Sequence, residues 1–127
     1  MPLVRIDLPD DKPAEYRGIA GEVVYSAMTQ TLDVPVNDRF LVICGHRRSD
    51  LVIDADYLGI RRSKDALVVQ VTLNEGRTVD VKKAFYRAVA DGLHQRLGLR
   101  REDVVISLVE VRKENWSFGN GEAQYAP

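Results

Sequence analysis

An internal repeat at an offset of 65 residues is the feature that most limits the folds open to this chain. The aligned apolar pairs are Leu3 and Val68, Ile6 and Val71, Leu8 and Leu73, Val23 and Ala88, Met28 and Leu93, Leu32 and Leu97, Val34 and Leu99, and Ile43 and Leu108. Asp38 also aligns with Asp103, and no gap is needed over about 45 residues. Because apolar positions keep one register throughout, the pattern indicates a true duplication.

Each copy of the repeat has the pattern of a strand, a helix and a second strand. The predicted strands are 3–8, 40–44, 66–73 and 104–111, and the predicted helices are 13–32 and 78–97. Pro35 ends the first helix, because the residue before a proline is pushed out of the helical region, and Gly98 ends the second. We expect residues 45–65 to form a long connection with one short strand at 51–53. Residues 115–121 are expected to form a loop or short hairpin.

This order predicts an α+β fold built from two β-α-β units. Parallel strands joined by a right-handed crossover would give a four-stranded sheet with both helices on one face. The other face would stay bare, and a small sheet with a bare face and free edges usually associates, so we expect a homo-oligomer. The length predicts a single domain over 1–127, with repeat halves at about 2–46 and 67–111.

Composition excludes several classes of protein. Eighteen Lys and Arg residues against 19 Asp and Glu give a net charge of −1, which provides no long-range attraction to nucleic acid or anionic membranes. No apolar run is long enough for a membrane span, and the N-terminus alternates too early for a signal peptide. Cys44 is the single cysteine and cannot form an internal disulfide, so we expect a cytoplasmic protein.

Pro2 is the most informative candidate for chemistry. The initiator Met1 is normally removed before a small residue such as proline, which would expose a secondary amine at the start of a core strand. Ordinary α-amines titrate at about 7.7–8.0, so burial and nearby charge decide whether such an amine acts as a base or an acid. A retained Met1 would make the nitrogen an amide and abolish this chemistry. The alternative, that a Met-Pro start has no function, stays open.

Three segments carry a resemblance to a known family. They are Pro2-Leu3-Val4-Arg5-Ile6-Asp7-Leu8, Val34-Pro35-Val36-Asn37-Asp38-Arg39-Phe40 and Trp116-Ser117-Phe118-Gly119. Together they resemble the tautomerase superfamily, and most of all its malonate semialdehyde decarboxylase group, over essentially the whole chain. The resemblance implies a homotrimer of duplicated β-α-β subunits with the terminal proline in each active site.

The resemblance also implies roles for individual residues. Pro2 matches the family's cationic general acid, and Asp38 matches the carboxylate that orients a water molecule or the proline. Arg77 matches an arginine that holds the substrate carboxylate, a task that suits the guanidinium fork. Trp116 and Phe118 would wall an apolar substrate pocket.

One departure from the decarboxylases concerns Glu75, which stands where they place a second arginine. A like charge near a carboxylate substrate is unfavourable, so either another arginine helps or the substrate differs. The chain is similar here to homologues that keep a single arginine in the segment Gly76-Arg77-Thr78.

Each of the other candidates has a structural alternative. Asp38 could cap the turn before a strand, as its repeat counterpart could, and Arg77 could face solvent. Trp116 could belong to the core or to an interface. His46 follows the strand after Asp38 and could bind substrate in the pocket, as a similar histidine does in the relatives. Neither His46 nor His94 has the neighbours of a metal site.

The resulting hypothesis is an enzyme that acts on a small 3-oxo or 2-oxo carboxylic acid without a metal or organic cofactor. A cationic Pro2 favours a decarboxylase or hydratase, because a nearby cation stabilises a developing enolate. A neutral Pro2 favours a keto-enol tautomerase of 2-oxo acids such as phenylpyruvate. A non-catalytic trimeric binding module is the alternative of a different class.

Overall fold

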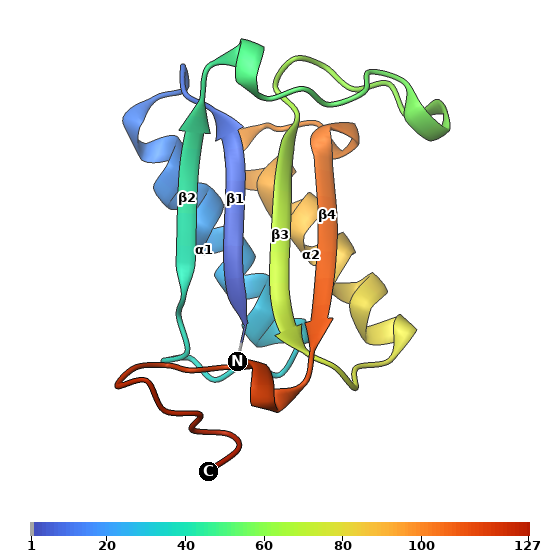
Figure 1. Ribbon diagram of the computed structural model, residues 1–127. Helices are drawn as coiled ribbons and strands as arrows, with labels where there is room; N and C mark the ends of the chain where they lie inside the picture. Colours follow the sequence, from blue (N-terminus) through green and yellow to red (C-terminus); the bar gives the residue numbers. More distant parts are fainter. Residues whose placement is uncertain (1) are drawn as a thin grey trace.

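Four strands form one sheet in the order β2-β1-β3-β4 in the computed structural model, which describes residues 2–127 (Figure 1). The elements are β1 Leu3–Pro9, α1 Ala14–Thr31, β2 Leu41–His46, β3 Leu67–Asn74, α2 Val79–Leu97 and β4 Val104–Val111. The two outer pairs are parallel and the central pair, β1 with β3, is antiparallel. The predicted fold class is therefore confirmed, and the expected removal of Met1 lies outside the described residues.

The two halves of the chain form their parallel pairs in the same register. In the first half Val4 lies opposite Leu41, and in the second Val69 lies opposite Ile106, so 37 residues separate the partners in both. These two pairs are related by the offset of 65 that aligns the sequence halves. The apolar positions of one half thus occupy the same places in the sheet as those of the other.

The central antiparallel pair contains the symmetry axis of the duplication. Arg5 lies opposite Gln70, its own repeat counterpart. When a residue pairs with its own counterpart across antiparallel strands, a two-fold axis passes between them. Each end of the sheet is therefore the counterpart of the other, and the start of β1 corresponds to the start of β3.

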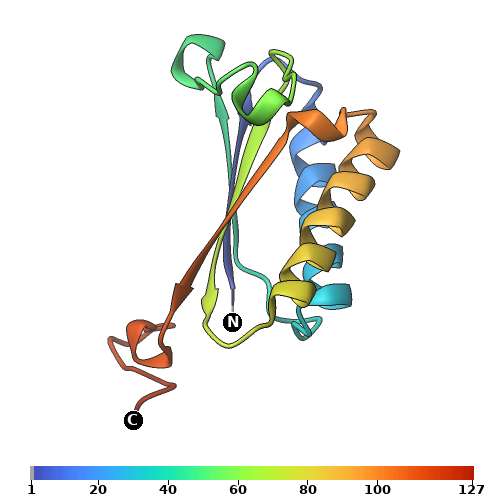
Figure 2. The ribbon, with the colours of Figure 1, turned by 90° about the vertical axis from the view of Figure 1, so that its right-hand side faces the viewer.

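The helices α1 and α2 cover the same face of the sheet, as predicted, and neither lies on the opposite face (Figure 2). The helix-facing side chains of β1 and β3 are fully buried, and Phe85 of α2 is 0% exposed against them. On the bare face Leu3, Val42 and Val109 stay about 40% exposed. Neither helix within residues 2–127 is long and apolar enough to cross a membrane.

The connection between β2 and β3 differs from the prediction. Residues 51–53 form no strand, and they run between two 3₁₀ turns, Arg48–Asp50 and Tyr57–Gly59. The prediction of a short strand was wrong, because no strand of the sheet pairs with these residues. Ionic contacts instead hold the two ends of the connection. The Arg48 guanidinium binds the Asp11 carboxylate at 2.6 Å, the Asp65 carboxylate at 3.1 Å and the carbonyl oxygen of Lys64.

Asp38 and Asp103 occupy equivalent turns but have different surroundings. Their backbone N–H groups donate to Pro35 at 3.1 Å and to Arg100 at 2.9 Å, two carbonyls that are repeat counterparts. The Asp103 carboxylate is buried and accepts hydrogen bonds from both the backbone N–H and the hydroxyl of Ser63, each at 2.6 Å. Asp103 therefore anchors the β2–β3 connection to the turn that precedes β4.

Replacing Asp103 by alanine should lower the free energy of unfolding by about 2–3 kcal/mol, because it removes two hydrogen bonds and leaves the Ser63 N–H without its acceptor. Urea denaturation followed by circular dichroism measures the change. Asp50→Ala, which removes an exposed ion pair with Arg47 and a long, exposed hydrogen bond from the Ser49 hydroxyl, serves as the control and should change little. Equal effects of the two variants would contradict the anchoring role.

Candidate active site

A hollow of about 190 Å³ lies at the end of the sheet where β1 begins. Its lining residues are Pro2, Leu3, Phe40, Trp116, Ser117 and Phe118. Pro2 is buried and precedes β1 directly, so its backbone is held by the sheet. The structure thus brings together three of the predicted site residues, Pro2, Trp116 and Phe118, from opposite ends of the chain.

The walls of the hollow are aromatic. The rings of Trp116 and Phe118 stack with centroids 5.3 Å apart. The ring of Phe118 also packs against Phe40, with centroids 6.1 Å apart, and makes an edge-to-face pair with Tyr125, with centroids 5.1 Å apart. The backbone N–H of Phe118 donates to the side chain of Gln124 at 2.9 Å, which folds the tail back on itself. The C-terminal segment after β4 therefore supplies most of an apolar, low-dielectric wall beside Pro2.

Asp38 lies in the loop that leads from α1 to β2, two residues before Phe40 of the hollow. The N–H of Val4 donates to the carbonyl of Phe40 at 2.9 Å, which holds this loop against the start of β1. Only 9% of Asp38 is exposed, and burial raises the pKa of its carboxyl above the ordinary value. The arrangement keeps a proton-exchanging group close to the end of the sheet that carries Pro2.

Arg77 lies in the turn between β3 and α2, at the same end of the sheet. Gly76 before it has a φ of 120°, a conformation that side chains rarely adopt, and this sharp turn directs the arginine. Its guanidinium donates to the carbonyl of Leu32 from Nε at 3.2 Å and Nη2 at 3.0 Å, and to the carbonyl of Asn74 from Nη1 at 3.2 Å. A guanidinium has five N–H groups, so two donors are left for a carboxylate.

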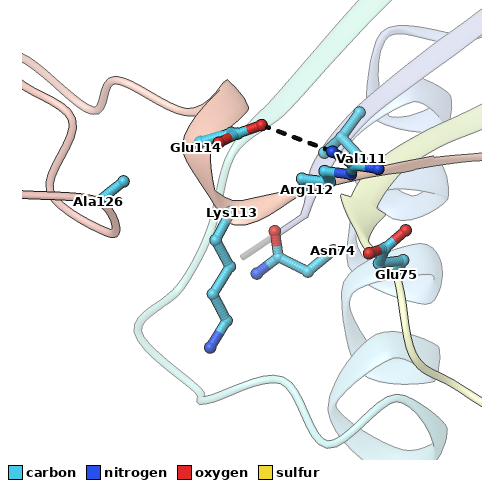
Figure 3. A pocket seen from close by; sticks show the side chains of 7 residues that line it. All are labelled: Asn74, Glu75, Val111, Arg112, Lys113, Glu114 and Ala126. Carbon is cyan, nitrogen blue, oxygen red and sulfur yellow. Dashed lines mark ion pairs between the residues drawn. The ribbon is translucent and has the colours of Figure 1, made fainter.

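Glu75 lies on a second, larger hollow, of about 470 Å³, at the ends of β3 and β4 (Figure 3). Arg112, Lys113 and Glu114 also line it, and Arg112 pairs with Glu114 at 4.0 Å. Glu75 is not among the residues that line the aromatic hollow. Glu75 is exposed and shares this hollow with Arg112 and Lys113, so its charge lies outside the aromatic hollow that holds Pro2.

His46 lies at the far end of the sheet from Pro2. It is opposite Pro9, the last residue of β1, so roughly 20 Å of strand separates it from the hollow of the same chain. Its Nε2 contacts the Asp7 carboxylate at 2.6 Å on the bare sheet face. Partial burial raises the pKa of Asp7, but hydrogen bonds with His46 and Arg5 outweigh it and lower the pKa overall. The expectation that His46 faces the pocket is wrong within one chain, because strand direction places it at the opposite end.

Three residues that sequence reasoning did not assign belong to this region. Phe40 and Tyr125 extend the aromatic wall, and Asn74 accepts a hydrogen bond from the indole of Trp116 at 2.7 Å. Asn74 and Trp116 are 42 residues apart in the sequence, so no local spacing indicates their contact. Within residues 2–127, no group of three His, Cys, Asp or Glu side chains is placed to hold a metal ion.

Comparison with known proteins finds a matching family and a relative of nearly the same length. The sequence pattern of the family described as "Tautomerase enzyme" matches residues 38–119. The probable tautomerase YusQ of Bacillus subtilis (strain 168) is 36% identical over 124 residues, which cover 98% of each chain.

Two solved structures are similar over nearly the full length. One is FG41 malonate semialdehyde decarboxylase inhibited by 3-bromopropiolate, with a TM-score of 0.90 and 34% identity, covering 97% of this chain and 93% of that one. The other is malonate semialdehyde decarboxylase, described with decarboxylase and hydratase activities. Its TM-score is 0.89 at 28% identity, and the matched region covers 97% of this chain and 95% of the decarboxylase chain.

The raised pKa of Asp38 makes a prediction about the pH dependence of stability. The folded protein keeps the proton on Asp38 where the unfolded chain, with its ordinary pKa near 3.8, has lost it. The contribution of Asp38 to the free energy of unfolding therefore falls as the pH rises from the ordinary pKa toward the raised one. Asp38→Asn, which cannot ionise, should gain stability relative to the wild type as the pH rises above the ordinary carboxyl pKa of 3.8. Urea denaturation at several pH values measures this difference, and a difference independent of pH would contradict the assignment.

Proposed function

The chain belongs to the tautomerase family, and on this premise we propose that it is a cofactor-independent decarboxylase of a small 3-oxo acid, with hydratase activity on activated unsaturated acids. The observation that carries the proposal is the placement of buried Pro2 beside the stacked rings of Trp116 and Phe118. The 34% identity to FG41 malonate semialdehyde decarboxylase over nearly the whole chain supports the reaction class.

In the proposed mechanism the substrate carboxylate binds the two remaining donors of Arg77. The ammonium of Pro2, formed after removal of Met1, donates a hydrogen bond to the substrate carbonyl oxygen and polarises it. The bond between the carboxylate carbon and its neighbour then breaks, carbon dioxide leaves, and the electron pair forms an enolate that the cation stabilises. A proton from Pro2 converts the enolate to the carbonyl product, and water returns a proton to the amine. Asp38 orients the proline or a water molecule for this exchange.

A second candidate is a keto-enol tautomerase of 2-oxo acids such as phenylpyruvate. The apolar lining of the hollow favours it, because an apolar environment lowers the pKa of an amine and makes the neutral, basic form of Pro2 available. The name of the Bacillus relative, a probable tautomerase, points the same way.

We also propose that the chain forms a single domain, with its two halves at about 2–46 and 67–111, and assembles as a homotrimer. The bare sheet face, with its exposed Leu3, Val42 and Val109, supports association. A trimer without catalysis is the alternative of another class. A protein of that class would have the same fold but would not require a free amine at Pro2.

The state of the N-terminus separates these candidates. Mass spectrometry of the purified protein should show that Met1 is absent, and a retained Met1 would exclude every proline mechanism. The pKa of the Pro2 amine, followed by NMR, should then lie well above neutral for a decarboxylase or hydratase. A value below neutral would favour the tautomerase.

Substitution of Pro2 or Arg77 by alanine should reduce turnover at least a thousandfold and leave the trimer intact by size-exclusion chromatography. Arg77→Ala should also lower the unfolding free energy by about 2 kcal/mol, because three hydrogen bonds from a charged group are lost. Arg77→Lys keeps the charge without the fork and separates the two effects. Arg47→Ala is a matched control on an exposed, distant arginine. Full activity in Pro2→Ala or Arg77→Ala would refute the assignment.

A further inference from the structure

We infer that Asn74 is a positioning residue that holds Trp116 in place and ties it to Arg77. The inference rests on the proposed function of the aromatic hollow. Asn74 is the last residue of β3 and pairs in register with Val111, the last residue of β4, so its backbone belongs to the sheet. The Nε1–H of Trp116 donates to its side-chain oxygen at 2.7 Å.

The chemistry of the indole fixes the orientation of the Asn74 amide. The Trp116 Nε1–H can only donate, so the oxygen of the amide must face the ring and the NH₂ group must point away. Figure 3 shows the Asn74 side chain projecting into the larger hollow beside Lys113. A stacked ring can slide over Phe118 at little cost, whereas a directional hydrogen bond at its one polar atom restrains it.

The same residue also accepts a hydrogen bond from Arg77. Nη1 of the guanidinium donates to the backbone carbonyl of Asn74 at 3.2 Å. One residue at a strand end therefore contacts both the aromatic wall of the hollow and the arginine that the proposed mechanism places against the substrate. The distance between the aromatic wall and the carboxylate-binding guanidinium depends on Asn74, and this arrangement is built entirely within one chain.

Because Asn74 acts through Trp116, its loss should affect substrate binding more than the chemical step. Without the acceptor, the indole would leave a polar N–H unpaired in an apolar wall and would sample other positions. We expect Asn74→Leu, which keeps the volume and removes the acceptor, to raise KM about tenfold with kcat changed less than threefold.

The test uses Trp116 as a reporter, because it is the only tryptophan of the chain. Its emission and its quenching by acrylamide are measured in the full-length protein without substrate, for the wild type, Asn74→Leu and Asn74→Asp. Asn115→Leu makes the same amide-to-leucine change at a neighbouring exposed position and is the control. Thermal unfolding of each variant establishes that it is folded.

We expect the quenching constant to rise at least twofold in Asn74→Leu and to stay within 1.3-fold of the wild type in Asn74→Asp and Asn115→Leu, since aspartate keeps an acceptor. An unchanged constant in Asn74→Leu, or an equal rise in Asn74→Asp, would overturn the inference. This result does not depend on turnover, so failure of the proposed function would leave it standing and would show separately as absence of activity.

If Asn74→Leu does not fold, Trp116→Phe removes the donor from the other side of the same bond. It should raise KM about tenfold, and Asn74→Ser in that background should add less than twofold. If Asn74→Ser raised KM as much in the Trp116→Phe background as in the wild type, the inference would be overturned. The effect of Asn74 on KM would then not depend on its hydrogen bond with the indole.

Discussion

The antiparallel pairing of β1 with β3 is the contact on which the rest of the structure depends. Each β-α-β half has a strand pair and one helix, and neither half can enclose a core by itself. The pairing of Arg5 with Gln70 joins the halves about a two-fold axis and brings both helices onto one face, where they bury the same core. It also sends β1 and β3 in opposite directions, so equivalent residues of the two copies lie at opposite ends of the sheet.

Those two ends have become chemically different. At the end away from the hollow, the counterpart of Pro2 is Leu67, an internal residue of the chain. The carboxylate of Asp103 is occupied by Ser63, and the counterpart of Arg77 is Lys12, which pairs with Asp65 at 2.8 Å. The duplicated fold thus offers two similar ends, and ion pairs and hydrogen bonds close one of them.

Much of the fold follows from local pattern, because periodicity reports which side of a strand or helix meets the core. The same reasoning failed at residues 51–53, where a short apolar run has no partner strand and lies outside the sheet. It also failed for His46 within one chain. The parallel pairing expected of strands 3–8 and 40–44 puts the end of the second strand at the end of the first, away from Pro2, and the observed register places His46 beside Pro9.

The sequence by itself determined the elements, the duplication and the N-terminal proline, since each is a property of neighbouring residues or of one repeated spacing. Only the tertiary structure decided how the active end is assembled. The contacts of Arg77 with Leu32 and of Trp116 with Asn74 join residues 45 and 42 positions apart. Such contacts depend on where the sheet ends and turns bring side chains, and no spacing along the chain encodes them. The proline that the proposed function depends on is therefore readable from the sequence, whereas its surroundings are a product of folding.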